Sequence, residues 1–195
     1  MADPAPARPI PPSRCTSERY LELTDEGLLR SDDRVELLEG VIVSMAPHTP
    51  RHSAGVRRAS RVLYEAVGRR AVVQVQLTFV AGRFSVPEPD VAVLPGTEAD
   101  YDAVHPSKAL LVVEVGESSL PQDRITKAAI YARAGIPEYW IVNLRDDRVE
   151  VFRSPDAAKR RYRRTTVARR GERLALAALP GVSVAVDDLL PGRPA

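Results

Sequence analysis

Two carboxylates in the middle of the sequence lie where metal-assisted chemistry could use them. Glu114 is inside the apolar run 110–115, where an unpaired carboxylate is costly, so a cation, a metal ion or several donors must compensate it. Asp90 follows Pro89 and opens a second short apolar run. If the two runs are adjacent strands, both carboxylates can converge on one hard cation such as Mg²⁺, which prefers oxygen ligands. The simpler alternative is that Asp90 caps a turn and Glu114 pairs with one base.

The segment after the second acid predicts a helix over residues 117–135. Ser119 and Gln122 have the spacing of a capping box, in which each side chain satisfies a backbone N–H of the first turn. Pro121 suits that first turn because its missing N–H is not needed there. Gly135 marks the end of the helix.

One face of this predicted helix carries a candidate catalytic amine. Asp123, Lys127 and Tyr131 are four residues apart and share the face. Lys127 could be an exposed partner of Asp123, which is worth only about 0.3–0.5 kcal/mol. Alternatively, its ammonium reaches Glu114 and stabilises negative charge on a phosphate in the transition state. The two alternatives differ in whether this face of the helix looks at Glu114.

Three further features could belong to the same site. His52 falls one turn ahead of Val56 on the apolar side of a predicted helix, where it is either a semi-buried structural histidine or a cleft residue. Glu36 alternates with the apolar positions of a predicted hairpin. Residues 159–170 hold seven basic residues and no acidic one. Such a run is either a solvated sheet edge or a contact to phosphates that carries no sequence information.

The elements that must position these residues follow from hydrophobic periodicity and turn residues. A helix capped by Thr16 or Ser17 should place Tyr20, Leu21 and Leu28 on its apolar side. The other expected elements are a hairpin over 34–45 closed at Glu39 and Gly40, a helix from 49 to about 68, strands at 71–80, 89–94, 110–115, 137–143 and 148–152, and edge strands within 159–186. This order predicts an α/β or α+β domain, a mixed sheet flanked by helices.

Composition limits the class of protein. The chain has 195 residues, 44% of them hydrophobic and 28% charged, with a net charge of +2, and these values are typical of one globular domain. The single Cys15 excludes an internal disulfide and a cysteine-based zinc site. No segment resembles a signal peptide or a membrane span, so we expect a cytoplasmic protein. Five prolines in the first twelve residues predict a disordered tail over 1–15, ahead of a single domain over 16–190 and a short tail over 191–195.

The sequence contains no phosphate loop, Gly-rich dinucleotide turn, HExxH or GxSxG, which leaves the carboxylates as the main chemical signal. Together with their surroundings they resemble a known family, the Uma-type restriction endonucleases of the PD-(D/E)XK nuclease superfamily. The resemblance covers about residues 16 to 190. It is carried by 35–40, His52, Pro89 and Asp90, Glu114 and Val115, Ser118 and Ser119, Asp123, Lys127, Tyr131, 135–142, 179–182 and 188–190.

The resemblance implies a restriction-endonuclease-like core that hydrolyses phosphodiester bonds in DNA. Its metal ion, Mg²⁺ or alternatively Mn²⁺, would be bound by Asp90 and Glu114. Lys127 would orient the attacking water and stabilise charge on the phosphate. The supporting residues would be Glu36, His52 and Tyr131. By analogy with enzymes that cut two strands, a homodimer is expected.

One departure from the superfamily concerns the lysine. In the usual signature the lysine stands two residues after the second acid, and here that position is Gly116. The resemblance places the lysine on the following helix, as Lys127. Two other functions stay open: a catalytically inactive nuclease-fold module that binds nucleic acid or a protein partner, and a structural protein in which Glu114 and Lys127 form a buried ion pair.

Overall fold

The structure, a computed structural model, describes residues 14–192. The expected tails therefore lie mostly outside the described residues. The inner end of the first one contacts the domain, since the Arg14 guanidinium donates to the Glu39 carbonyl at 2.8 Å and the Cys15 N–H donates to the Gly40 carbonyl at 3.0 Å. Within residues 14–192 no helix is both long enough and apolar enough to cross a membrane.

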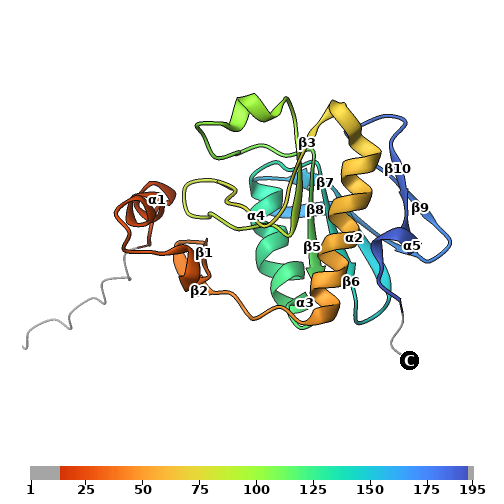
Figure 1. The fold of residues 1–195 in the computed structure, drawn as a ribbon, viewed down its shortest axis with the longest axis horizontal. Coiled ribbons are helices and arrows are strands. Elements are labelled where there is room, and N and C mark those ends of the chain that lie inside the picture. Colours follow the sequence, from red (N-terminus) through yellow and green to blue (C-terminus); the bar gives the residue numbers. More distant parts are fainter. Residues whose placement is uncertain (1–13, 193–195) are drawn as a thin grey trace, which may run out of the picture.

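A six-stranded sheet forms the centre of the fold (Figure 1). Its order is β3-β4-β5-β6-β7-β8, in which β5 and β6 are parallel and all other neighbours are antiparallel. Every residue of β5 and β6 is buried, as expected for near-continuous apolar strands covered on both faces. The strands are β3 (Val72–Gln74), β4 (Val91–Leu94), β5 (Leu111–Gly116), β6 (Glu138–Asn143), β7 (Arg148–Asp156) and β8 (Arg161–Arg169). The predicted mixed sheet, with residues 110–115 in its interior, is confirmed.

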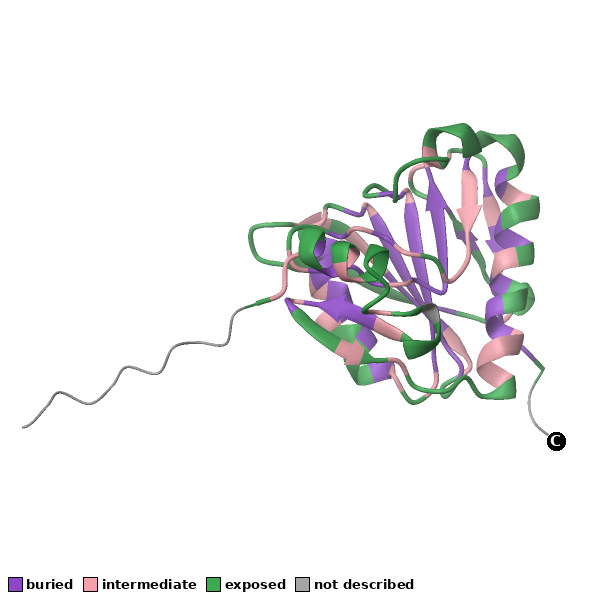
Figure 2. Ribbon diagram, turned by 60° about the vertical axis from the view of Figure 1, so that its left-hand side comes forward, coloured by how far each residue is buried: buried purple, intermediate pink, exposed green. Residues whose placement is uncertain are grey.

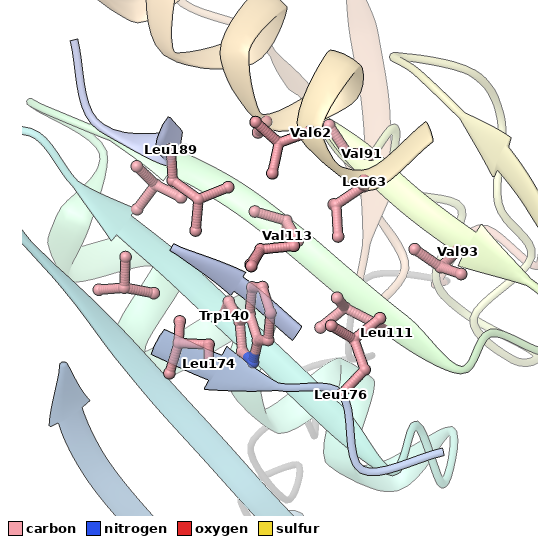
Figure 3. Close-up of a cluster of buried hydrophobic side chains, with 14 of the residues drawn as sticks. Val62, Leu63, Val91, Val93, Leu111, Val113, Trp140, Leu174, Leu176 and Leu189 are labelled. Atoms are coloured by element: carbon pink, nitrogen blue, oxygen red, sulfur yellow. The ribbon is translucent and has the colours of Figure 1, made fainter. Parts of the chain in front are cut away.

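Two hydrophobic layers cover the two faces of the sheet, because successive side chains of a strand point to opposite faces. Val113 and Val115 pack with helix α2 (Pro50–Val67), whereas Val112 packs on the other face with helix α4 (Ala128–Arg133). Figure 3 shows the first layer, in which Trp140 and Val113 of the sheet lie beneath α2. The predicted helix from 49 to about 68 is confirmed, and Thr49 caps it, since its hydroxyl accepts the His52 N–H at 3.1 Å.

Smaller elements surround this core. In the hairpin of β1 and β2, Glu39 and Gly40 have φ of 53° and 86°, the paired positive values of a tight two-residue turn, which confirms the predicted hairpin. The remaining elements are α1 (Ser17–Asp25), β1 (Val35–Leu38), β2 (Val41–Ser44), β9 (Arg173–Ala175), β10 (Ser183–Ala185), α5 (Val186–Leu189) and short 3₁₀ turns at Ser31–Asp33, Gly68–Arg70 and Glu98–Tyr101.

The strand predicted over 71–80 is largely wrong, because only β3 is a strand there. Gln76 adopts a positive φ of 48°, which turns the chain out of the sheet. The Gln74 side-chain amide then donates to the carbonyls of Leu77 and Thr78 at 2.9 and 3.1 Å. Beyond this point the backbone keeps single bonds to the segment before β4, from the Gln76 N–H to the Pro89 carbonyl and from the Phe79 N–H to the Pro87 carbonyl, and the regular ladder ends at Gln74.

Two other expected placements also differ. Leu28 was expected on the apolar side of the first helix, but α1 ends at Asp25 and Leu28 is exposed. The segment around 174–186 does form strands, yet β9 and β10 pair with each other rather than with the main sheet. Together with α5 they cover the α2 side of the sheet, where Leu174 and Leu189 join the first hydrophobic layer (Figure 3).

Candidate active site

A polar cleft opens where β4 begins and β5 ends, beside the N-terminus of α2. Its cavity volume is about 110 Å³, and it is bounded by the segment after β2, by α2 and by the helix that follows β5. Five of the six predicted site residues line it, and the sixth, Tyr131, is buried behind Glu114. The ionisable side chains that line the cleft are Glu36, His48, His52, Glu88, Asp90, Glu114, Glu117, Asp123 and Lys127.

The two predicted acids meet at the end of the sheet. In the antiparallel pair of β4 and β5, Val91 lies opposite Val113, so the register continued by one residue places Asp90 opposite Glu114. Residues in directly opposite positions have Cβ atoms about 4.5–5.5 Å apart on one face. Asp90 is held there because its Oδ2 accepts the Val115 N–H at 2.8 Å. The two strands are neighbours, as the sequence predicted.

Lys127 reaches these acids from the helix. Its Nζ lies 3.1 Å from Glu114 Oε1 and 3.3 Å from Glu36 Oε2. The Tyr131 hydroxyl donates to the same Glu114 Oε1 at 2.7 Å. Lys127 is only 7% exposed, so the alternative of a solvated helix-surface lysine is wrong. The helix face that carries Lys127 and Tyr131 looks at Glu114.

A π turn (Asp123–Lys127) lies between α3 (Leu120–Gln122) and α4 and shapes this face. The Asp123 carbonyl accepts the N–H of Ala128, five residues on, and also the Tyr139 hydroxyl at 3.2 Å. In a regular α-helix four residues turn through about 400°, so residues at this spacing drift around the axis. Asp123 and Lys127, the first and last residues of the π turn, both line the cleft. Such insertions occur frequently at functional sites.

Three acids that line the cleft, Glu88, Glu117 and Asp123, were not assigned to the site from the sequence. Asp123 is buried, and its Oδ2 accepts the Ser119 hydroxyl at 2.7 Å. The predicted capping box of Ser119 and Gln122 is therefore wrong, because Asp123 engages that hydroxyl instead. Glu88 is half-buried at the cleft wall. The only sequence signals for these acids were the four-residue spacing of Asp123 from Lys127 and the alternation of Glu88 with Asp90.

His52 connects Asp90 to the strand that carries Glu114. Its Nδ1 lies 2.8 Å from the Val115 carbonyl, and its Nε2 lies 3.3 Å from Asp90 Oδ1 without hydrogen-bond geometry. Burial opposes a charged imidazole, but the Asp90 carboxylate outweighs it and raises the pKa of His52. Burial likewise opposes a charged Asp90, and His52 with the Val115 N–H lowers the pKa of that carboxyl. Both predicted descriptions of His52 therefore apply: it is semi-buried, and it lines the cleft.

The cleft holds more carboxylates than cations. Burial raises the pKa of Glu114 to about 8, against the opposing effect of Lys127, and burial raises the pKa of Asp123 to about 6. Burial alone would lower the pKa of Lys127, but the carboxylates of Glu114 and Glu36 raise it, so the ammonium stays charged. The single ammonium of Lys127 thus lies near several carboxyl groups. A bound cation would reduce the repulsion between the carboxylates and lower their pKa values.

A metal ion in this cleft would have two carboxylates as its protein ligands. Among the described residues no group of three or more His, Cys, Asp and Glu side chains is arranged around one point. Two carboxylates, Asp90 and Glu114, occupy opposite positions when the β4–β5 register is continued by one residue. The side-chain contacts of Glu114 described above fall on its Oε1, so its Oε2 remains available. Mg²⁺ is often bound by one or two carboxylates with waters completing the octahedron, and this donor set fits that mode.

Gly116 explains why the lysine comes from the helix. A Cβ at this position would lie 2.6 Å from Leu120 Cδ2 and 2.9 Å from Asp123 Oδ2. The place where the superfamily usually has its lysine is therefore occupied by the start of the helix and by a cleft acid. Lys127, farther along the helix, reaches Glu114 Oε1 at 3.1 Å instead.

We expect Gly116→Ala to lower the free energy of unfolding by about 1–3 kcal/mol, the usual cost of overpacking. Leu120 is buried and Asp123 is held by Ser119, so neither neighbour can move away freely. Urea unfolding measures the change. Gly192→Ala is the matched control, because a Cβ there meets nothing within 4 Å. Equal stability of the two variants would contradict the crowding at position 116.

An ion pair outside the cleft anchors the π turn to the sheet. Arg124 donates through Nε to Glu150 Oε2 at 2.8 Å, and Asn143 donates to Glu150 Oε1 at 2.8 Å. Burial would raise the pKa of Glu150, but these hydrogen bonds, with those of Arg148, lower it to about 2. The turn that presents Lys127 is thus tied to β7.

This depressed pKa predicts a specific acid sensitivity. The contribution of Glu150 is fully present above its ordinary pKa near 4.5 and is lost as pH falls toward 2, a difference of about 3 kcal/mol at about 1.4 kcal/mol per pKa unit. Urea unfolding at several pH values should therefore show Glu150→Gln less stable than wild type at pH 7, with the two converging near pH 2. Parallel stability curves would show that the ion pair contributes nothing.

The basic run is separate from the cleft. It forms the edge strand β8 and the turns on either side of it. Several of its arginines pair with acids outside the cleft, which supports the prediction of a solvated sheet edge. These pairs are Arg160 with Glu39, Arg163 with Asp156 and Arg170 with Asp147.

A mixed sheet flanked by helices, with two opposed acids and a lysine at one sheet end, defines a nuclease-like α/β protein. A family model described as "Putative restriction endonuclease", Uma2, matches residues 17–187, and the chain belongs to that family. The fold is also similar to a crystal structure from Anabaena variabilis ATCC 29413 described as "a putative nuclease belonging to DUF820". The TM-score is 0.69 at 18% identity over 89% of this chain and 96% of that chain, which shows a shared fold. No curated protein matches the sequence.

Proposed function

We propose that this protein is a metal-dependent endonuclease that hydrolyses phosphodiester bonds in DNA. One observation carries the proposal: the Lys127 ammonium lies 3.1 Å from Glu114, while Asp90 stands opposite that acid across the β4–β5 pair. An amine and two acids from three separate elements converge in an open cleft. Membership of a restriction endonuclease family supports the same reaction class.

The contacts of each side chain in the cleft suggest its role in the reaction. Lys127, charged and almost dehydrated, would orient the attacking water and stabilise the negative charge that develops on the phosphate. Tyr131 and Glu36 would position the Glu114–Lys127 pair. The Tyr131 hydroxyl donates to Glu114, and the Glu36 carboxylate lies within ion-pair distance of Lys127. His52 would hold Asp90 as an anion in its place opposite Glu114.

Asp90 and Glu114 are the residues that would bind Mg²⁺, with Mn²⁺ as an alternative. Such an ion, when bound, supplies a water of lowered pKa and neutralises charge on the phosphate. The fit rests on the opposed carboxylates and on the surplus of acid in the cleft.

The direct test is cleavage of supercoiled plasmid DNA with Mg²⁺, with Mn²⁺ and with EDTA. The proposal expects cleavage by wild type only with metal. It also expects loss of cleavage in Lys127→Ala and unchanged cleavage in Lys108→Ala, a variant of an exposed lysine outside the cleft. Equal cleavage by all three proteins would assign the activity to a contaminant.

A second candidate is an inactive nuclease-fold module that binds nucleic acid or a protein partner. The observation that favours it is the Glu36–Lys127–Glu114 ion-pair network, which is complete without a metal. This candidate expects salt-sensitive DNA binding that is the same in Asp90→Asn and in wild type, with no cleavage under any metal condition.

A further inference from the structure

Exposed apolar side chains gather at the β3 edge of the main sheet. Among the described residues eight large hydrophobic side chains are exposed, and three of them flank this edge: Tyr64 at 66%, Leu77 at 59% and Val104 at 62%. They come from α2, from the segment after β3 and from the loop after β4. In Figure 2, β3 is the pink, half-buried strand beside α2, next to purple strands. An apolar sheet edge of this kind marks an interaction surface.

The edge has a groove on each face of the sheet. On the α2 side, Tyr64 and Val73 line a hollow of about 300 Å³. On the opposite side, Leu77 and Val104 line a hollow of about 330 Å³. Val73 belongs to both, so β3 stands as a ridge between two apolar grooves. None of the residues that line these grooves lines the polar cleft.

The two edges of the sheet are protected differently. Proteins usually block edge-to-edge pairing with charges or proline. The β8 edge has such charges, among them Arg161 and Arg164. By contrast, residues 72–75 are Val-Val-Gln-Val, with neither charge nor proline, and β3 has β4 as its sheet neighbour on one side only. The β3 edge is therefore ready to accept another strand.

We propose that β3 is a homodimer interface, in which β3 of a second copy pairs antiparallel across a two-fold axis near Val73. The six-stranded sheet would continue from one copy into the other, and the two α2 helices would lie antiparallel on the same face. Tyr64 and Val73 of one copy would then pack against Tyr64 and Val73 of the second copy and fill the α2-side groove. The inference does not depend on the proposed nuclease activity. It rests on the apolar side chains at the β3 edge, and none of these lines the acidic cleft.

Charge on the groove rim selects a second copy over an unrelated partner. Arg61 and Glu65 flank Tyr64 on α2 and pair with each other at 3.1 Å, both about half exposed. An interface built on a two-fold axis must be complementary to itself. When two such helices lie antiparallel and centred between these residues, Arg61 of each faces Glu65 of the other. The pattern is self-complementary.

Sedimentation velocity tests the proposal at protein concentrations up to about 100 µM, well above a micromolar Kd. Wild type should sediment at twice 21.4 kDa, and Val73→Lys and Tyr64→Glu should sediment at 21.4 kDa. Tyr64→Glu changes an exposed side chain, so it keeps the test valid if Val73→Lys fails to fold. Val167→Lys, a matched change on the β8 edge, should stay dimeric.

Crosslinking gives an independent readout, because Cys15 is the only cysteine. In a Cys15→Ser background, a cysteine placed at position 72, 73 or 74 should form a disulfide-linked dimer for at least one position. Opposite residues of antiparallel strands have Cα atoms about 4.5–5.5 Å apart, within disulfide reach. Cysteine at position 167 should not crosslink. A monomeric wild type, or a dimer unaffected by Val73→Lys and Tyr64→Glu, would overturn the proposal and leave this edge for a different protein. Since these measurements use no DNA, they stand whether or not the protein cleaves it.

Discussion

Lys127→Met should reduce DNA cleavage by about 10²–10³-fold, the usual cost of removing one group that stabilises transition-state charge. It should also lower the free energy of unfolding by about 3–5 kcal/mol, because Glu114 and Glu36 lose their buried cation. Plasmid cleavage and urea unfolding measure the two effects. Lys108→Met is the control, since Lys108 is exposed and outside the cleft.

A double variant, Lys127→Met with Glu114→Gln, separates the catalytic effect of Lys127 from its effect on stability. An uncharged amide can keep the hydrogen bond from Tyr131, so we expect most of the lost stability to return while cleavage does not. Return of both would show that Lys127 has only a structural role. Failure of the stability to return would show that the ion pair is not what the single variant loses.

The stability loss of Lys127→Met should depend on pH. Burial raises the pKa of Glu114 to about 8 even with the ammonium present. A carboxyl with a raised folded-state pKa destabilises the protein above its ordinary pKa, here 4.5, and increasingly so up to its folded-state pKa. Because wild type already carries this raised pKa, the two proteins differ only once Glu114 ionises in wild type, so the deficit of Lys127→Met should grow as pH rises above about 8. A constant deficit would mean that Glu114 does not titrate in this range.

The sequence predicted the elements whose pattern is local. The apolar run around Glu114 required a central strand and a compensating partner, and the helix after it offered Lys127 and Tyr131 at a spacing that shares one face. Both expectations agree with the contacts in the structure. The acidic residue at position 90 could be placed because its strand pairs directly with the strand of Glu114.

Other features depend on contacts between distant segments and left no local pattern. The π turn forms where the Tyr139 hydroxyl, sixteen residues away, reaches the Asp123 carbonyl. The role of Asp123 as a buried cleft acid follows from that turn. The regular ladder of β3 ends at Gln74, just before the left-handed Gln76, and the Gln74 amide donates to the carbonyls of Leu77 and Thr78. Gly116 was visible as a departure from the superfamily, yet its cause, the space taken by Leu120 and Asp123, is tertiary.

Asp90→Asn should abolish both metal-dependent cleavage and metal-dependent thermal stabilisation. A ligand at one hundred times its Kd adds about 2.7 kcal/mol. For a chain of this size that raises Tm by about 5–10 °C. Asparagine retains an oxygen that can accept the Val115 N–H, so the strand contact persists while the charge is lost. Thermal unfolding with Mg²⁺ or EDTA measures the shift, and Asp102→Asn, an exposed carboxylate outside the cleft, should keep it.

The rise in Tm that Mg²⁺ causes in wild type should grow as pH rises from 6 to 9. Metal ions bind the deprotonated carboxylate, and burial holds the pKa of Glu114 at about 8, so protons compete with the metal at the lower pH. In Glu114→Gln the shift should be small at every pH, because one of the two opposed carboxylates is then missing. A shift of the same size in wild type, Asp90→Asn and Glu114→Gln would place the metal outside the cleft. Because thermal unfolding needs no substrate, this result would bear on the metal site even if the protein cuts no DNA.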